Sequence, residues 1–267
     1  MIIVNAPIGI IDSGVGGLTV VKEMLERLPH EPIIYIGDDE RCPYGPRPEE
    51  EVRQFTTEMA TALADMGIKM LVIACNTATA AAMDDIREQF NFPVIGVIEP
   101  GARAAVNASK MKKIAVLGTL GTINSCAYND AIHAFSVDAQ IHSLACPEFV
   151  PIVEKGHYKT EKAGHIVERT LHEISNKDFD AVILGCTHYP LLQHHIQNHL
   201  PKDVTIISSA IETVCDVERT LRLNSIANKP GNDAPSVFYT TGELHDFQEI
   251  VIDWLSIEKP DVRTIIL

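Results

Sequence analysis

The sequence predicts an α/β protein with two pseudo-symmetric domains, each a mainly parallel sheet flanked by helices. Three observations predict this fold. Short apolar runs alternate with longer segments of helical spacing, an order that is typical of βαβ units. Two parts of the chain carry similar motifs about 110 residues apart. Turn-rich polar residues follow the apolar runs, as expected where strands of a parallel sheet end.

The apolar runs and the helical segments predict the order of the elements. Apolar runs of strand length lie at 8–11, 33–36, 71–74, 94–97, 114–117, 141–144, 181–184, 204–207 and 237–240. Apolar residues at helical spacing predict helices at 18–28, 49–66 and 79–90, with further helices from 211 and around 247–255.

The internal repeat is the most informative feature of the sequence. MLVIACNTAT at 70–79 matches DAVILGCTHYP at 180–190, which aligns Cys75 with Cys186. Upstream, IGIIDSGVGGLT at 8–19 resembles IAVLGTLGTINS at 114–125. Because α/β folds bind ligands at the carboxyl ends of parallel strands, we expect two related domains whose facing loops form an active-site cleft. The two cysteines would then meet in that cleft.

Composition excludes several classes of partner. The chain has 267 residues and a formal net charge of −14, which argues against a nucleic acid or an anionic membrane as partner. No apolar run approaches the roughly 18 residues of a membrane span, and the start MIIVNAPIGIID lacks the features of a signal peptide. The six cysteines include no C-x-x-C and no zinc-like spacing. We therefore expect reduced thiols, a cytoplasmic location and no metal.

The loop DSGVGGLT at 12–19 could be taken for a dinucleotide fingerprint. Thr19 occupies the position of the third glycine, so the motif is broken, although Asp38 has the spacing of a ribose ligand. We expect instead a turn that holds an anion such as a carboxylate at a helix N-terminus. Asp12 in this loop is a poor anion ligand and a candidate for proton transfer or amine binding.

Each of the two aligned cysteines precedes small polar residues. Asn76 or Thr77 is expected to cap the following helix, which would lower the pKa of the Cys75 thiol through the helix dipole. Cys186 is expected to lie in the same way at the start of a helix. His188 is a candidate acid or base for this thiol. Packing in the core explains either cysteine alone about as well as reactivity does. It does not explain why two cysteines stand at corresponding positions of the repeat.

Other polar residues have simpler explanations. Tyr44 and Gly45 could reach the cleft from a turn-rich loop, whereas Cys42 is expected to be incidental. The histidines at 194, 195 and 199 fit an exposed helix face better than a metal site, because no acidic residue accompanies them.

Two facing thiols restrict the chemistry. A cysteine hydrolase needs one thiol and a base, and disulfide exchange needs the sulfurs in bonding contact. A two-base racemisation or epimerisation uses both thiols, because one removes a proton from a carbon and the other delivers a proton to its opposite face.

The sequence resembles the glutamate racemase family of the Asp/Glu racemase superfamily over nearly its whole length. The matching segments are IGIIDSGVGGLTV, CPYGPRPEEEV, LVIACNTATAAA, PVIGVIEPGA, GTLGTINSCAY, CPEFVPIVEKG and ILGCTHYPLL. The resemblance implies a cofactor-independent isomerase that interconverts L- and D-glutamate, supplies D-glutamate for peptidoglycan and forms a homodimer. It also implies that Cys75 deprotonates the D-enantiomer and Cys186 the L-enantiomer.

The resemblance further implies roles for individual residues. Residues that match substrate-contacting motifs are Asp12, Ser13, Tyr44, Gly45, Asn76, Thr77, Thr187 and His188. Asp12, His188 and Glu154 match auxiliary residues that tune the thiols, and Thr119 and Thr122 are expected to be extra donors to a substrate carboxylate. The family fold implies a first domain made of 1–98 and 208–267 and a second made of 99–207.

The chain departs from the family pattern at three positions. Asp39 and Glu40 stand where a Thr and a small residue are common, and Ser208 stands where Asp is frequent. The first departure is expected to change the charge of the entrance loop. Because the N-terminus lacks a long extension, we expect no activation by a cell-wall precursor.

Two other functions remain open at this stage. An aspartate racemase, or a related amino-acid racemase of the same superfamily, would share the motifs. A two-domain small-molecule binding protein would explain the repeated loops without chemistry.

Overall fold

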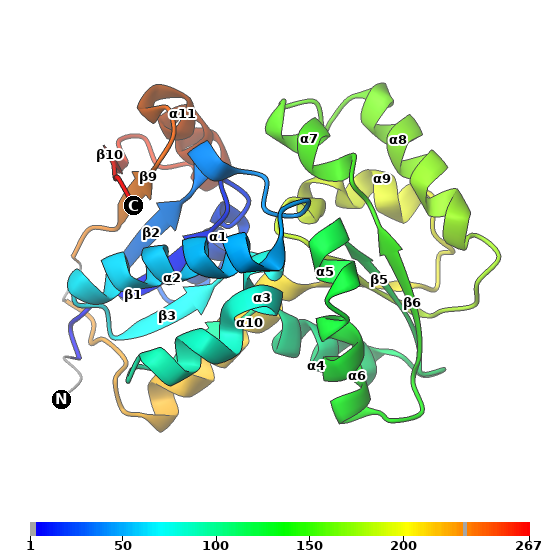
Figure 1. Ribbon diagram of the computed structural model, residues 1–267, viewed down its shortest axis with the longest axis horizontal. Helices are drawn as coiled ribbons and strands as arrows, with labels where there is room; N and C mark the ends of the chain where they lie inside the picture. Colours follow the sequence, from blue (N-terminus) through cyan, green and yellow to red (C-terminus); the bar gives the residue numbers. More distant parts are fainter. Residues whose placement is uncertain (1–3, 232–233) are drawn as a thin grey trace.

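The computed structural model of the protein describes residues 4–231 and 234–267, which form two parallel sheets lying side by side (Figure 1). Helices cover both faces of each sheet, so the expected α/β class with two sheets is confirmed. Residues 1–3 and 232–233, which the prediction assigned to the first domain, lie outside the described residues. The domain boundaries at 98/99 and 207/208 stay a prediction.

The first sheet contains both ends of the described chain. Its strands run in the order β10–β9–β2–β1–β3–β4. Their bounds are β1 Ile8–Asp12, β2 Ile33–Gly37, β3 Met70–Ile73, β4 Val94–Gly96, β9 Val237–Thr240 and β10 Asp261–Thr264.

The second sheet comes from the middle of the chain and has the order β6–β5–β7–β8. Its strands are β5 Lys113–Gly118, β6 Gln140–Ala145, β7 Ala181–Gly185 and β8 Thr205–Ser208. The order β2–β1–β3–β4 in the first sheet is the same, with β1 corresponding to β5 and β3 to β7. The repeat seen in the sequence is therefore a repeat of strand order.

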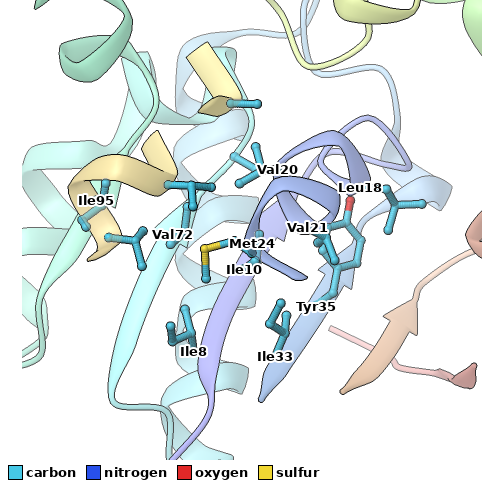
Figure 2. Close-up of a cluster of buried hydrophobic side chains, with 14 of the residues drawn as sticks. Ile8, Ile10, Leu18, Val20, Val21, Met24, Ile33, Tyr35, Val72 and Ile95 are labelled. Atoms are coloured by element: carbon cyan, nitrogen blue, oxygen red, sulfur yellow. The ribbon is translucent and has the colours of Figure 1, made fainter. Parts of the chain in front are cut away.

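Alternate strand residues of the first sheet enter two different cores, as the period of two in a strand requires. Ile8, Ile10 and Val72 pack beneath α1 (Figure 2). Ile11 and Ile73 pack on the opposite face. The helices of the first face are α1 Leu18–Arg27, α10 Ser209–Leu223 and α11 Leu244–Leu255. Those of the opposite face are α2 Glu49–Asp65 and α3 Asn76–Gln89.

The second sheet is covered in the same way. One face carries α7 Phe149–Glu154, α8 Glu161–Leu171 and α9 Gln193–Asn198. The other face carries α4 Ile98–Ala108 and α6 Ala127–Phe135, and the short α5 Leu120–Asn124 follows the carboxyl end of β5. Because both faces of both sheets are covered, the ends of the strands are the edges open to a ligand.

The structure differs from the expected elements in several places. The helices α4, α5, α6, α7 and α8 have no counterpart among the expected helices. The strand β10 was not predicted, because its four residues include one apolar side chain and are half-buried or exposed. The helix α3 begins at Asn76, three residues before the expected start. No helix in residues 4–231 and 234–267 combines the length and the apolar character that a membrane span requires.

Candidate active site

Cys75 lies where β3 ends and α3 begins. Its own side chain caps the helix, because the Ala78 N–H donates to Cys75 Sγ across 3.4 Å. The Cys75 thiol also contacts Ser13 Oγ at 3.6 Å, after the neighbouring strand β1. The expectation that Asn76 or Thr77 caps the helix is wrong, since the thiol itself occupies the capping position.

The expected lowering of the pKa of Cys75 is also wrong. Burial of the side chain, followed by the negative charge of Asp12, raises the pKa of Cys75 to about 12. The hydrogen bonds from Ala78 and with Ser13 act in the opposite direction but are weaker. Desolvation disfavours a thiolate more than one helix end favours it, so this thiol is protonated at neutral pH.

Cys186 lies in the corresponding position after β7 but has different surroundings. A short 3-10 helix, Tyr189–Leu192, follows it where the sequence predicted an α-helix like the one after Cys75. Cys186 Sγ lies 3.7 Å from His188 Nδ1. The other ring nitrogen, Nε2, makes a short hydrogen bond with Glu154 Oε1. The structure thus assembles the expected group Cys186, His188 and Glu154.

The charge on His188 is set by competing effects. Burial acts to lower its pKa, but the hydrogen bonds and negative charges of Cys186 and Glu154 raise that pKa well above its ordinary value. His188 is therefore able to carry a proton beside the Cys186 sulfur at neutral pH.

Asp12 connects the two thiol segments. Its carboxylate is fully buried and accepts hydrogen bonds from the Gly14 N–H at 3.1 Å and from Thr187 Oγ1 at 3.3 Å. Burial raises the pKa of Asp12 to about 6, while the charge of His188 opposes this shift. Asp12 is thus a carboxyl group poised to titrate near neutral pH, between Cys75 and Thr187.

The glycine-rich loop packs directly against the Cys186 segment. A Cβ atom on Gly16 would lie 2.4 Å from Thr187 Oγ1 and 2.6 Å from the His188 ring. Thr19 Oγ1 also contacts the Thr187 carbonyl oxygen at 3.3 Å. Gly16 is needed for this close approach, which accounts for the resemblance to a nucleotide-binding loop.

Asp38 has an internal role in place of the ribose contact that the spacing suggested. Its buried carboxylate accepts hydrogen bonds from Arg41 Nε at 2.6 Å, from Thr241 Oγ1 at 2.9 Å and from the Tyr44 hydroxyl. The Tyr44 hydroxyl proton is therefore already used within the protein. The neighbouring Gly45 carbonyl accepts from the Gly121 N–H at 2.8 Å.

Three threonines from both sheets meet at one end of the site. Thr77 Oγ1 lies 2.9 Å from Thr119 Oγ1 and 3.2 Å from Thr122 Oγ1, and the last two oxygens are 3.0 Å apart. All three side chains are buried. The structure therefore brings together hydroxyl groups that the sequence placed 45 residues apart.

The departures at Asp39 and Glu40 lie beside the site. Both line a cavity of about 550 Å³, together with Glu154, Glu243 and Asp246 among others. Burial, with the charges of Glu154 and Asp12, raises the pKa of Asp39 to about 7, although a hydrogen bond from Thr240 opposes the shift. Cys42 Sγ lies 4.0 Å from Glu154 Oε1, so Cys42 is close to the site as well.

The sequence did not indicate Tyr128 as part of the site, and it suggested a different role for Asp38. Tyr128 donates a hydrogen bond to Asn76 Oδ1 at 2.7 Å, and Asp38 holds Tyr44. Both stand inside or beside segments that matched the family, but a tyrosine and an aspartate carry no spacing signal for these partners. In the described part of the chain, no group of three or more His, Cys, Asp or Glu side chains is arranged to hold a metal ion.

The fold and the paired thiols agree with a family of racemases. A family model described as Asp/Glu/Hydantoin racemase matches residues 8–215. The chain belongs to this family.

Individual relatives are similar over nearly their full length. A glutamate racemase from Listeria innocua is 51% identical over 258 residues, which cover 97% of each chain. The crystal structure of a glutamate racemase isoform from Bacillus anthracis has a TM-score of 0.95 at 45% identity and covers 98% of both chains. A glutamate racemase from Francisella tularensis in complex with D-glutamate has a TM-score of 0.92 at 33% identity, covering 99% of this chain and 98% of that one.

Proposed function

We propose that this chain interconverts L- and D-glutamate by proton transfer at the α-carbon, with Cys75 on one face and Cys186 on the other. The observation that carries the proposal is the presence of two buried thiols at the ends of the corresponding strands β3 and β7. Glutamate as the substrate is supported by the full-length relatives named glutamate racemase, one of which was solved with D-glutamate.

In the L-to-D direction, the Cys186 thiolate takes the α-proton, so that the substrate C–H bond breaks and an S–H bond forms. The Cys75 thiol gives its proton to the opposite face of the carbanion and becomes a thiolate. The roles reverse for D-glutamate. The raised pKa of Cys75 suits a thiol that starts as the proton donor.

The auxiliary residues act on the thiols. His188 and Glu154 form a proton-holding pair beside Cys186, at 3.7 Å from its sulfur. Asp12 acts on both sides, because its charge influences Cys75 and its carboxylate accepts from Thr187.

The remaining polar groups bind the substrate. Those from the first sheet and its loops are Ser13, Tyr44, Gly45, Asn76 and Thr77, and those from the second are Thr119, Thr122, Thr187 and His188. Hydrogen-bond donors aimed at a carboxylate stabilise the negative charge that builds up as the α-proton leaves. Each sheet with the helices that cover it is called a lobe here. Since the donors come from both sheets, bound glutamate would hold the two lobes together.

We further propose that the reaction needs no cofactor and that its product supplies D-glutamate for peptidoglycan, and so for cell-wall biogenesis and cell shape. The same proposal includes a cytoplasmic location and a homodimer as the active form. Sedimentation at two protein concentrations tests the dimer, and depletion of the protein in a cell-wall-forming host tests for D-glutamate auxotrophy.

The direct test uses L-glutamate in heavy water with no added cofactor. Loss of optical activity together with deuterium at the α-carbon is the expected result. A protein that neither racemises glutamate nor exchanges its α-proton would refute the proposal. Parallel assays with L-aspartate distinguish a racemase of different specificity, and ligand binding without exchange would indicate a binding protein.

A further inference from the structure

The Asn76 side chain lies between the two thiol segments and has one end bonded and one end free. Asn76 directly follows Cys75, and its side chain is 98% buried, since only 2% of it is exposed. Its Oδ1 accepts a hydrogen bond, whereas its buried Nδ2 makes none with any residue that the structure describes. A buried amide N–H without a partner is costly unless a ligand accepts from it.

The partner of Asn76 Oδ1 is Tyr128, which comes from the other lobe. The Tyr128 hydroxyl donates to Asn76 Oδ1 at 2.7 Å. The ring of Tyr128 also packs beside Gly185, the residue before Cys186, because a Cβ there would lie 3.0 Å from Tyr128 Cε2. Tyr128 therefore touches both the residue after one thiol and the residue before the other.

The direction of the hydrogen bond is determined by the groups around Tyr128. Burial raises the pKa of Tyr128, so the phenol keeps its proton at neutral pH. A phenol has one proton to donate, and Asn76 Oδ1 receives it. The amide nitrogen is consequently the end that faces away from Tyr128.

We propose that Tyr128 is a positioning residue that holds the Asn76 amide with Nδ2 turned toward a substrate carboxylate. The inference rests on the proposed glutamate-binding site and extends it by one residue, from Asn76 to Tyr128. Because Tyr128 belongs to α6 and Asn76 begins α3, the amide is oriented only when the two lobes are together.

The test compares Tyr128→Phe with wild type in steady-state racemisation and in thermal unfolding. Without the phenol, Asn76 Oδ1 loses its donor and the amide is free to turn. We expect KM for glutamate to rise by about 10-fold or more, the loss expected for a hydrogen bond to a charged group, with a smaller change in kcat because the bond is made in both ground and transition states.

An Asn76→Ala background separates positioning from a general structural role. If Tyr128 acts through the amide, Tyr128→Phe adds nothing to the KM of Asn76→Ala. Additive effects in the double variant, or an unchanged KM in Tyr128→Phe, would overturn the inference. Tyr189→Phe is the matched stability control, because its buried hydroxyl donates to the Cys146 carbonyl within one lobe.

Two further measurements keep the outcome decisive. Asn76→Asp keeps an acceptor for the Tyr128 hydroxyl but replaces the Nδ2 donor with an oxygen. It is expected to raise KM and serves if Tyr128→Phe does not fold. If wild type fails to racemise glutamate, the proposed function fails, and protection against thermal unfolding by D-glutamate then decides the inference. Protection of wild type that is weakened in Tyr128→Phe supports it, and equal protection or none contradicts it.

Discussion

The two cysteine segments occupy the same position in two sheets of the same strand order, yet their surroundings differ. Cys75 caps a 14-residue helix and contacts Ser13, and burial keeps its thiol protonated. Cys186 precedes a four-residue 3-10 helix and has His188 and Glu154 beside it. The backbone repeat provides two equivalent thiols, while the neighbouring side chains give each thiol a different way of holding its proton.

This difference has a consequence for the kinetics. Because enantiomers have equal free energies in water, kcat/KM must be the same in both directions whatever the variant. A variant that affects one thiol can therefore change kcat and KM by different factors in the two directions, but kcat/KM for L-glutamate must stay equal to kcat/KM for D-glutamate.

The largest effect is expected from removing either thiol. Cys75→Ser and Cys186→Ser should each lower the racemisation rate by roughly 100-fold to 10,000-fold, the contribution of a general acid or base. Circular dichroism of the amino acid measures the rate. Cys126→Ser is the control, because Cys126 is exposed and lies outside the site. A mild loss in one of the two variants would show that the thiols are not both required.

A large effect is also expected where the two halves touch. Gly16→Ala would bring a Cβ within 2.4 Å of Thr187 Oγ1 and push the Cys186 segment out of position. We expect kcat to fall by roughly tenfold or more, since small misplacements are costly in catalysis, and stability to fall by about 1–3 kcal/mol through overpacking.

Gly164→Ala provides the control for this substitution, because the new Cβ would meet only the His195 ring at 3.2 Å. Denaturant unfolding and kcat are measured on both variants. Wild-type turnover in Gly16→Ala would mean that the Cys186 segment does not depend on this contact.

A moderate effect is expected from Glu154→Gln. Glu154 is one of the two groups that raise the pKa of His188, so the loss of its charge should lower that pKa. The alkaline limb of the kcat–pH profile should shift to lower pH by the same amount. Ser13→Ala touches only the Cys75 side and is expected to leave this limb in place. Equal shifts in both variants would contradict the separate proton partners.

The smallest effect on turnover is expected from Asp39→Asn, which acts mainly on stability. The folded state holds the Asp39 proton up to a pH of about 7, against an ordinary pKa of 3.8. The stability from this group is thus complete below that ordinary value and is lost as the pH rises through about 7.

Wild type should lose on the order of 1–3 kcal/mol more unfolding free energy than Asp39→Asn between pH 4 and pH 8. Asn keeps an acceptor for the Thr240 hydroxyl, which now donates to Asp39 at 2.6 Å. Urea unfolding at several pH values measures the difference, and parallel curves for the two proteins would contradict the raised pKa.

Local sequence patterns predicted most of the fold. All nine expected strands are present, because each is an apolar run bounded by turn residues. The strand β10 was not predicted. It is a strand because it pairs with β9, whereas its sequence contains no apolar run. The positions of Cys75 and Cys186 after β3 and β7 were also predictable, because aligned motifs after aligned strands reach corresponding edges of the two parallel sheets.

The immediate surroundings of the site were less predictable. The lowered pKa expected for Cys75 was wrong, because a helix terminus is visible in a sequence whereas burial beside Asp12 is not. Thr187 reaches Asp12 across 175 residues, and Tyr128 reaches Asn76 from the other lobe. Neither pair follows from spacing.

By itself, the sequence determined the α/β class, the repeated strand order and the positions of Cys75 and Cys186. Hydrophobic periodicity and the succession of strand, loop and helix are local properties of the chain. The tertiary structure alone decided that burial keeps the Cys75 thiol protonated, that Cys186 lies beside His188 and Glu154, and how the Asn76 amide is turned. These depend on desolvation and on contacts between residues far apart in the chain, and such effects arise only once the two sheets have been packed together.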